Sequence, residues 1–445
     1  MLAAQREVEL RHELLERLAQ ARARTDQLFG FVRQDSLYER PIAERHRIVF
    51  YIGHLEAFDW NLLRDRVLSV NALHPEYDRL FAFGIDPVGG GLPADQPQDW
   101  PSLADIRDYV ARARRTLDHS LQAQLSDIST PARQEFPVSL LLQVAIEHRL
   151  MHAETLAYML HQLPLDRKVQ PQLRPELVTR SATPRMIEIP AGRVTLGLRR
   201  DEPDSFGWDN EYEQHTPDVP AFAIDKYKVT NAQYLDFITA GGYENRDFWT
   251  RDDWNWKAEH NVAHPGFWHR RGDAWHLRTM FDEVPLPLDW PVYVSQAEAS
   301  AYARWAGKML PTETEWQHAA YGSPEGEERS YPWGEEAPSS RRGNFDFQRW
   351  DPTPVGAFPE GQSHFGVTDL FGNGWEWTST LFGPFPGFEP FPFYRGYSAD
   401  FFDDQHFVMK GGSARTAACM LRRSFRNWFQ PHYPHVYAGF RCVSQ

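Results

Sequence analysis

The sequence predicts an α+β chain with a helical bundle followed by a domain of short strands and long loops. Apolar residues recur at helical spacing through much of residues 1–163. After a proline-rich stretch the pattern changes, and short alternating segments are separated by loops rich in Trp and Gly. A chain of 445 residues is long enough for more than one core. We therefore place the bundle at residues 1–165, a linker at 166–184 and the second domain at 185–445.

The composition argues against two classes of partner. The chain has 47 Lys and Arg against 61 Asp and Glu, a formal net charge of −14, whereas nucleic acids and anionic membranes are bound by basic surfaces. We therefore expect small-molecule partners, no nucleic acid and no membrane. Only two cysteines, Cys419 and Cys442, argue against a disulfide-stapled secreted protein. The start of the chain is a charged amphipathic segment unlike a signal peptide, which favours a cytoplasmic location.

Four helices are predicted in the first domain. Leucines at helical spacing predict a helix over residues 1–30, and a second helix is expected to begin after Pro41 and run to about residue 68. Further helices are expected at 102–125 and 137–163. Between the second and third helices, residues 71–101 are rich in Pro, Gly and Asp and predict a long loop. A four-helix bundle of this kind can hold a metal ion in its core.

Histidines in two of these helices are the candidate metal ligands. His148 and His152 lie four residues apart, so both imidazoles project from one face of a helix. His54, in the middle of the second predicted helix, is the best candidate for a third ligand. Glu154 lies roughly 200° around the helix from His152, so we expect it in the second shell or on a solvated face. On spacing alone, a set of packed core histidines is an equally good interpretation.

In the second domain, short strands are expected to alternate with long loops rich in Trp and Gly, and helices interrupt them. Residues 187–197 alternate and turn as a pair of strands does. Helices are predicted at 231–239 and 295–306, and Ser295 and Glu298 have the spacing of a capping box at the start of the second of these. A third helix is expected to begin near Thr312.

Seven short blocks of the second domain resemble the formylglycine-generating-enzyme (sulfatase-modifying-factor) type of C-type-lectin-like fold. The blocks occur in one order at residues 229–234, 302–308, 310–313, 331–334, 372–377, 410–413 and 438–441. The resemblance implies this fold for residues 185–445. It does not imply formylglycine formation, because that enzyme uses two nearby cysteines, and Cys419 and Cys442 are far apart in the sequence.

Such a domain behind an N-terminal, DinB-like four-helix bundle resembles the ergothioneine sulfoxide synthases. These nonheme iron enzymes use O₂ to join sulfur to an imidazole carbon of hercynine, the betaine of histidine. The resemblance implies Fe²⁺ as cofactor, with His54, His148 and His152 as its ligands and Glu154 outside the ligand set. Three neutral imidazoles leave further positions of a ferrous ion open to substrate and O₂.

Residues 423–428 resemble the family segment that lines the betaine site. The resemblance implies that Asn427 and Trp428 bind hercynine, and an indole face attracts a quaternary ammonium by cation–π interaction. From the residues alone, the alternative is that Trp428 is a core side chain and that Asn427 caps a turn.

The donor site departs from the family pattern. Residues 80–93 lack the tyrosines and arginines that other members carry there, and residues 429 and 430 are Phe and Gln where some members have an Asp. A donor carboxylate would be left unpaired in such a pocket, at a cost in affinity. The selenoneine synthase branch, which uses a selenosugar without a carboxylate, fits this pattern. The candidate donor-pocket residues are Phe83, Asp86, Phe429 and Gln430.

Two alternatives stay open. One is a sulfoxide synthase that uses cysteine or γ-glutamylcysteine. The other is a noncatalytic binding module with a structural zinc, although structural zinc normally has four protein ligands. No catalytic acid or base is identified, because residues 379–382 hold no counterpart of the family's catalytic tyrosine.

Overall fold

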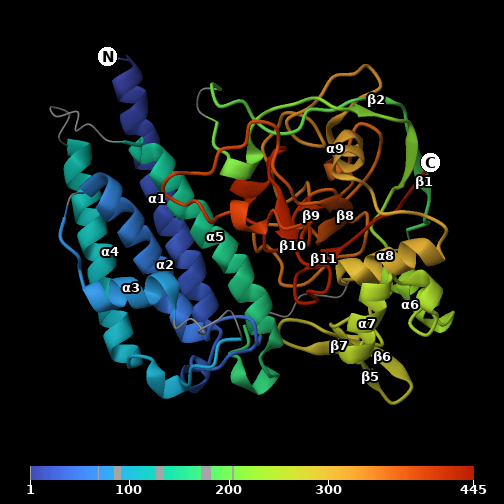
Figure 1. Cartoon of the computed structure of the whole chain (residues 1–445), viewed down its shortest axis with the longest axis horizontal. Coiled ribbons are helices and arrows are strands. Elements are labelled where there is room, and N and C mark those ends of the chain that lie inside the picture. Colours follow the sequence, from blue (N-terminus) through green and yellow to red (C-terminus); the bar gives the residue numbers. More distant parts are fainter. Residues whose placement is uncertain (1, 69, 85–91, 127–134, 172–181, 203–204) are drawn as a thin grey trace. The chain divides into compact units, whose positions relative to one another are not determined.

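The computed structural model describes residues 2–68, 70–84, 92–126, 135–171, 182–202 and 205–445. Contacts divide the chain into two compact units, Met1–Gln172 and Leu173–Gln445. The first unit is helical and the second contains both helices and sheets (Figure 1). The predicted α+β fold class is thus confirmed. Most of the predicted linker lies outside the described residues, so its conformation remains a prediction.

The first unit is built from five α-helices in its described residues. Helix α2 packs against α3, α4 and α5, and α5 also packs along α1. The helices are α1 (Leu2–Gly30), α2 (Ile48–Leu63), α3 (Pro75–Phe83), α4 (Leu103–Ser126) and α5 (Val138–Gln162). A single π-helical turn, Arg64–Leu68, continues α2. The interior of this unit therefore lies around α2 and α5, the two helices that carry the candidate ligands.

Two expectations for this unit were wrong. The second helix begins at Ile48 and not directly after Pro41, because Arg47 has an extended backbone and its Nε donates to Asp95 Oδ2 at 3.0 Å. Residues 71–101 are also not one long loop, because α3 lies within them. Its start is stabilised by the His74 side chain, whose Nδ1 accepts a hydrogen bond from the backbone N–H of Tyr77 at 3.2 Å.

The second unit contains four helices and four small sheets in its described residues. The helices are α6 (Asn231–Thr239), α7 (Arg251–Glu259), α8 (Gln296–Trp305) and α9 (Glu313–Tyr321). The strand orders are β1-β4-β12, β2-β3, β5-β6-β7 and β10-β9-β8-β11. The strands are β1 (Met186–Ile189), β2 (Gly192–Arg193), β3 (Asp218–Val219), β4 (Phe222–Asp225), β5 (Trp268–Arg271), β6 (Ala274–Arg278), β7 (Glu283–Pro285), β8 (Trp375–Leu381), β9 (Phe407–Lys410), β10 (Asn427–Phe429), β11 (Ala438–Gly439) and β12 (Val443–Ser444).

The predicted helices of this unit are confirmed, and their caps explain why. Thr230, Ser295 and Thr312 cap α6, α8 and α9, each in a capping box. Helix α7 was not predicted. Residues 187–197 do contain β1 and β2, but β1 pairs with β4 and β2 with β3, so these two strands are not each other's partners.

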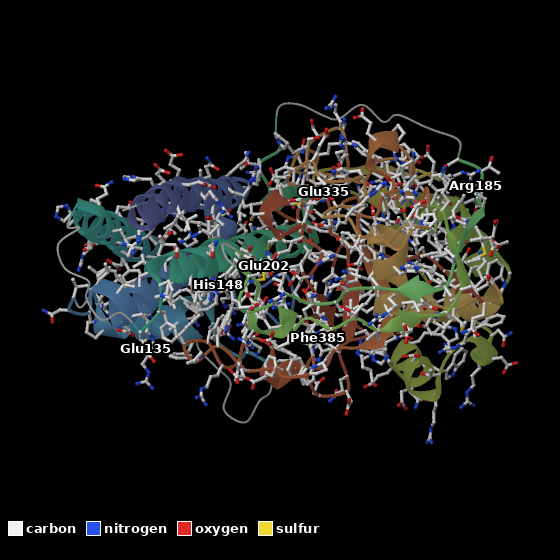
Figure 2. All side chains as sticks on the ribbon, turned by 90° about the horizontal axis from the view of Figure 1, so that it is seen from above. Glu135, His148, Arg185, Glu202, Glu335 and Phe385 are labelled. Carbon is white, nitrogen blue, oxygen red and sulfur yellow. The ribbon has the colours of Figure 1, made fainter. Side chains whose placement is uncertain are left out.

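Side chains of the described residues are drawn in Figure 2, where His148 lies on α5 in the helical unit. In the second unit, buried apolar side chains from β1, β4, α9 and the loop that precedes β8 form one core cluster, which includes Phe222, Trp316 and Leu370. None of the described helices is both long and apolar enough to cross a membrane.

Candidate functional site

The three predicted ligands meet inside the helical unit. His54 comes from α2, and His148 and His152 come from successive turns of α5. One nitrogen from each ring can be chosen so that all three lie within 4.8 Å of one another. His54 Nε2 lies 3.3 Å from His152 Nε2. Among the described residues, no other group of three or more His, Cys, Asp or Glu side chains has this geometry.

The orientation of His54 is set by α3. Its Nδ1 lies 2.8 Å from the carbonyl oxygen of Phe81. A carbonyl can only accept, so Nδ1 carries the proton and the lone pair of Nε2 faces His152. Gly53 permits this approach, because a Cβ at that position would lie 2.3 Å from the Phe81 ring. Such a hydrogen bond to the second ring nitrogen is typical of metal-binding histidines.

Two phenylalanines of α2 pack on the ligand rings. Phe58 stacks on His148 with ring centroids 3.4 Å apart and planes 9° apart. Phe50 stacks on His54 at 4.7 Å and 27°. His148 is 2% exposed. Packing therefore holds both rings in place, and the hydrogen bond to Phe81 also holds that of His54.

Electrostatics keep the three imidazoles neutral. Burial lowers the pKa of His54 to about 4, although its hydrogen bond with Phe81 opposes the shift. Burial and the neighbouring histidines also lower the pKa values of His148 and His152 well below the usual value. Neutral imidazole is the form that binds metal. Three neutral imidazole nitrogens suit Fe²⁺ or Zn²⁺, and so the residues present fit a resident metal ion.

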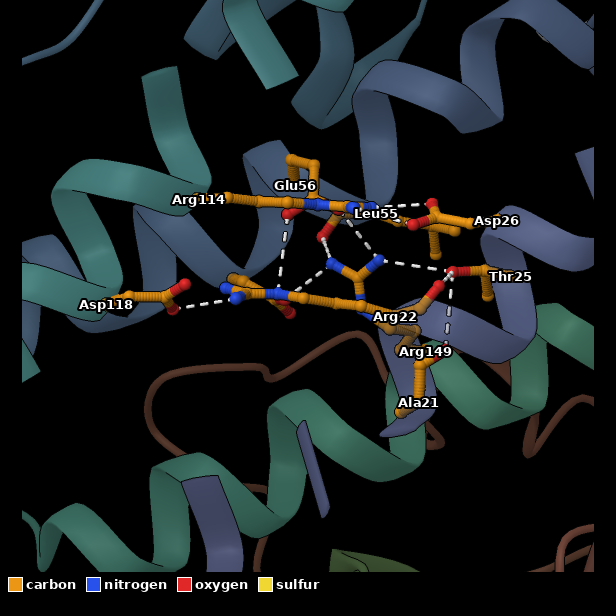
Figure 3. Close-up of polar contacts among 10 residues, drawn as sticks. Ala21, Arg22, Thr25, Asp26, Leu55, Glu56, Arg114, Asp118 and Arg149 are labelled. Atoms are coloured by element: carbon orange, nitrogen blue, oxygen red, sulfur yellow. Dashed lines mark hydrogen bonds and ion pairs between the residues drawn. The ribbon is translucent and has the colours of Figure 1, made fainter. Parts of the chain in front are cut away.

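A buried ionic network joins α2 and α5 (Figure 3). Arg149, directly after His148, donates from Nη1 to Glu56 at 2.9 Å and from Nη2 to Asp59 at 2.6 Å. The same Nη2 donates to the carbonyl oxygen of Leu55 at 2.9 Å. Arg114 of α4 donates to Glu56 at 2.8 Å. All the partners of Arg149 named here lie within five residues of His54.

The two carboxyls of this network differ in pKa. Burial opposes ionisation of both, but Arg149, Arg114 and Arg22 surround Glu56 and hold its pKa below the usual value. Burial dominates at Asp59, whose pKa is raised although Arg149 is its partner. Glu56 is therefore the firmly ionised partner of Arg149.

Glu154 is not on a solvated face. Its exposed fraction is 8%, so that part of the expectation was wrong. Glu154 does not belong to the three-residue cluster. A role for it in the second shell remains a prediction.

Asn427 and Trp428 lie on β10 of the second unit, beside β9. Trp428 stacks face to face on Phe382, with ring centroids 4.1 Å apart and planes 6° apart. The guanidinium of Arg426 also packs on Phe382, with its central carbon 5.0 Å from the ring centroid. Arg426 in turn forms a buried ion pair with Glu313, with its Nε 2.9 Å from Oε1. The plane of the Trp428 ring is thus fixed through Phe382.

Two further aromatic side chains border Trp428 and were missed by the sequence analysis. Tyr397 meets it edge to face at 5.5 Å, and Phe401 lies 5.7 Å away. Neither belongs to a family block or a periodic segment, so only the three-dimensional structure identifies them. A cluster of aromatic faces suits a quaternary ammonium ligand.

The predicted donor-pocket residues are dispersed between the two units. Phe83 ends α3 and is 67% exposed. In the second unit, Phe429 stacks on Tyr433 at 5.2 Å, and Gln430 is exposed. Asp86 lies outside the described residues. Their grouping into one donor pocket remains a prediction.

The fold and the histidine cluster define a class: a helical domain with a buried cluster of three histidines, followed by a mixed domain of small sheets. Two family profiles match these parts. The DinB superfamily matches residues 17–156, and the sulfatase-modifying factor enzyme 1-like domain matches residues 172–445, more than half of the chain.

Two of the relatives that match this chain do so over more than nine tenths of its length. Hercynine oxygenase of Mycolicibacterium smegmatis is 34% identical over 97% of this chain and 99% of that protein. Hercynine oxygenase of Mycobacterium tuberculosis is 42% identical over 55% of this chain and 56% of that protein. Ergothioneine biosynthesis protein 1 of Neurospora crassa is 27% identical over 92% of this chain and 55% of that protein. The chain thus spans little more than half the length of the last two. It belongs to the hercynine oxygenase family.

Proposed function

We propose that this chain is a nonheme Fe²⁺- and O₂-dependent enzyme that joins a chalcogen donor to an imidazole carbon of hercynine. The observation that carries the proposal is the cluster of three neutral histidines, with ligand nitrogens within 4.8 Å of one another. The names of the relatives, hercynine oxygenase and ergothioneine biosynthesis protein 1, support hercynine as the substrate.

The residues of the chain have distinct parts in this reaction. His54, His148 and His152 would hold a ferrous ion, which supplies binding and activation of O₂. Overall, the imidazole C–H and the donor S–H or Se–H each lose a hydrogen, and a carbon–chalcogen bond forms. O₂ takes up four electrons, so that one oxygen atom ends on the chalcogen and the other in water. In the second unit, Trp428 would bind the trimethylammonium group of hercynine, and Asn427 would supply an amide for hydrogen bonding.

For the donor, we propose a selenosugar, which would make the product a precursor of selenoneine. The supporting observation is that residues 80–93 contain no arginine, lysine or tyrosine to receive a donor carboxylate. A sugar needs hydroxyl partners and stacking instead, for which Phe83, Asp86, Phe429 and Gln430 are the candidates. The alternative donors, cysteine and γ-glutamylcysteine, would give a sulfoxide of the ergothioneine type.

The test is anaerobic reconstitution with Fe²⁺, followed by air, hercynine and one donor at a time. The donors are a selenosugar, its thiosugar analogue, cysteine and γ-glutamylcysteine, and products are identified by mass spectrometry. A selenium adduct of hercynine, with both amino-acid thiols inert, supports the full proposal. A sulfoxide from cysteine or γ-glutamylcysteine overturns the selenosugar but keeps the reaction class. No product with any donor, together with tightly held zinc, would favour a noncatalytic binding module.

A further inference from the structure

Arg149 is a charged side chain that is fully buried next to a metal ligand. Its side chain is 0% exposed, and those of Glu56 and Asp59 are 2% and 0% exposed. Burying charges is costly unless they are paired and hydrogen-bonded, and apolar side chains of similar size often do as well for stability. Stability alone therefore does not explain why an arginine occupies this position.

Three hydrogen bonds of Arg149 join the two helices that carry the candidate ligands, and a fourth, from Nη1 to Thr25 Oγ1 at 3.4 Å, reaches α1. Arg149 follows His148 on α5, and its partners Leu55, Glu56 and Asp59 lie one, two and five residues after His54 on α2. Three acceptors on two turns of α2 fix both the translation and the rotation of α5 against it. A slide of one helical turn, about 5.4 Å, would break all three contacts.

We propose that Arg149 is a positioning residue of the metal centre, which holds His54 at the correct distance from His148 and His152. The planar guanidinium suits this part, because its donors form a rigid fork that binds several acceptors at once. A lysine would retain the charge but not the fork. In this role Arg149 acts through the helices, and not through contact with substrate or O₂.

Arg114 offers a matched control. Its Nε donates to the same carboxylate, Glu56 Oε1, at 2.8 Å, and its Nη1 and Nη2 donate to Asp26 of α1 at 2.7 and 2.8 Å. It lies on α4 and makes no hydrogen bond to α5 among the contacts of the described residues. Arg114→Met therefore disturbs the same buried carboxylate without removing the link between the ligand helices.

The experiment measures Co²⁺ binding by the full chain, since the visible spectrum of Co²⁺ reports its coordination. The variants are Arg149→Met, Arg149→Lys, Arg114→Met and Asp59→Asn, with their folding checked by circular dichroism. We expect Arg149→Met to weaken Co²⁺ binding by roughly 10- to 100-fold, the effect typical of residues that orient ligands. We also expect an altered spectrum, partial recovery in Arg149→Lys, and wild-type binding in Arg114→Met.

Two results would overturn the proposal: equal losses of Co²⁺ affinity in Arg149→Met and Arg114→Met, or wild-type affinity in a folded Arg149→Met. If Arg149→Met does not fold, Asp59→Asn decides, since it weakens one arm of the fork with little change of shape; unchanged affinity and spectrum there would also overturn it. The inference rests on the metal centre of the proposed function. Metal binding without turnover would refute the proposed reaction alone, whereas a wild-type chain that binds no Co²⁺ would refute both.

Discussion

At the scale of single residues, the three candidate ligand histidines make the metal-free protein sensitive to acid. The pKa of His54 is about 4 in the fold, against 6.5 for the unperturbed side chain. The unfolded chain therefore binds more protons than the folded one between about pH 6.5 and 4, so the free energy of unfolding falls as the pH falls through this window. For His54 alone the loss is at most roughly 3 kcal/mol.

This prediction is checked by chemical unfolding of the metal-free protein from pH 7 to pH 4.5. We expect His54→Gln to lose less stability than the wild type over this range, because it has no imidazole to protonate. His119→Gln is the control, since His119 lies on α4 of the same unit and outside the cluster. Parallel acid profiles for the wild type and His54→Gln would contradict the prediction.

A second residue-scale prediction concerns the ring beneath Trp428. Replacement of Phe382 by Leu removes the aromatic plane that lies 4.1 Å from the indole. Because the stacking fixes the indole plane, we expect Phe382→Leu to weaken hercynine binding several-fold, as measured by calorimetry under anaerobic conditions. Phe237→Leu is the control. This variant also replaces a fully buried phenylalanine by leucine, but Phe237 packs against Tyr302 of α8 and not against Trp428. Equal effects of the two variants would show that the loss is one of general stability.

The candidate ligands could be predicted from sequence because two of them are local to one helix. The spacing of His148 and His152 places them on one face whatever the rest of the chain does. His54 is 94 residues away from His148, and only the tertiary packing of α2 on α5 brings the rings together. The partners that orient these rings, Phe81 and Phe58, were not predicted, because a backbone carbonyl and a core phenylalanine carry no distinctive sequence pattern.

At the scale of elements, the contact between α2 and α3 supports the candidate metal centre. Gly53→Ala would place a methyl group 2.3 Å from the ring of Phe81, which is 0% exposed and has little room to move. We expect α3 to shift, the hydrogen bond between His54 and Phe81 to lengthen, and stability to fall by about 1–3 kcal/mol. Metal affinity should fall as well, and a Co²⁺ titration measures it.

Gly30→Ala provides the comparison for this prediction. Gly30 ends α1, and a Cβ there would meet nothing within 4 Å. We expect neither metal affinity nor stability to decrease in this variant. If Gly53→Ala bound Co²⁺ as tightly as Gly30→Ala, the contact with α3 would have no part in positioning His54.

The elements that sequence predicted well are those whose ends are encoded locally. Three helices begin with a Ser or Thr whose hydroxyl accepts a hydrogen bond from the backbone N–H three residues later, and this spacing is visible in the sequence. The capping residues are Thr230, Ser295 and Thr312. The partners of β1 and β2 were not visible, because β1 pairs with β4 and β2 with β3 more than 20 residues away. Their strands are too short for alternation to specify a partner.

At the scale of the whole molecule, the change of composition after the predicted linker at residues 166–184 predicts a helical part followed by a mixed part, and the α+β class that it implies is confirmed. Aromatic side chains pin the loops of the second unit, as Trp208 does by stacking on Tyr397 at 4.0 Å across 189 residues of sequence. Contacts of such length depend on the complete fold, so the surroundings of Trp428 could not be derived from the chain alone. The resemblance of residues 423–428 to a family segment pointed to Asn427 and Trp428, but not to Tyr397 or Phe401.

The division into two units predicts separate responses to metal and to hercynine in hydrogen exchange. Backbone amides exchange their hydrogens when the fold opens locally, and a ligand that binds only the closed conformation slows this exchange. The slowing is about a hundredfold when the ligand concentration is 100 times its Kd. We expect Fe²⁺ under anaerobic conditions to slow exchange in α2, α3 and α5, and to leave β8, β9 and β10 unchanged. Hercynine added to the Fe²⁺ form should then slow exchange in β10, which carries Asn427 and Trp428.

The same measurement on His152→Ala and Trp428→Ala separates the two sites. The histidine variant should lose the protection that Fe²⁺ gives to α2 and α5, because only two ligands remain. The tryptophan variant should keep that protection and lose the effect of hercynine on β10. If Trp428→Ala retained full hercynine protection in β10, Trp428 would be a packed core side chain and the betaine would bind elsewhere. Mass spectrometry of peptides that cover 48–63, 138–162 and 427–429 decides between these outcomes.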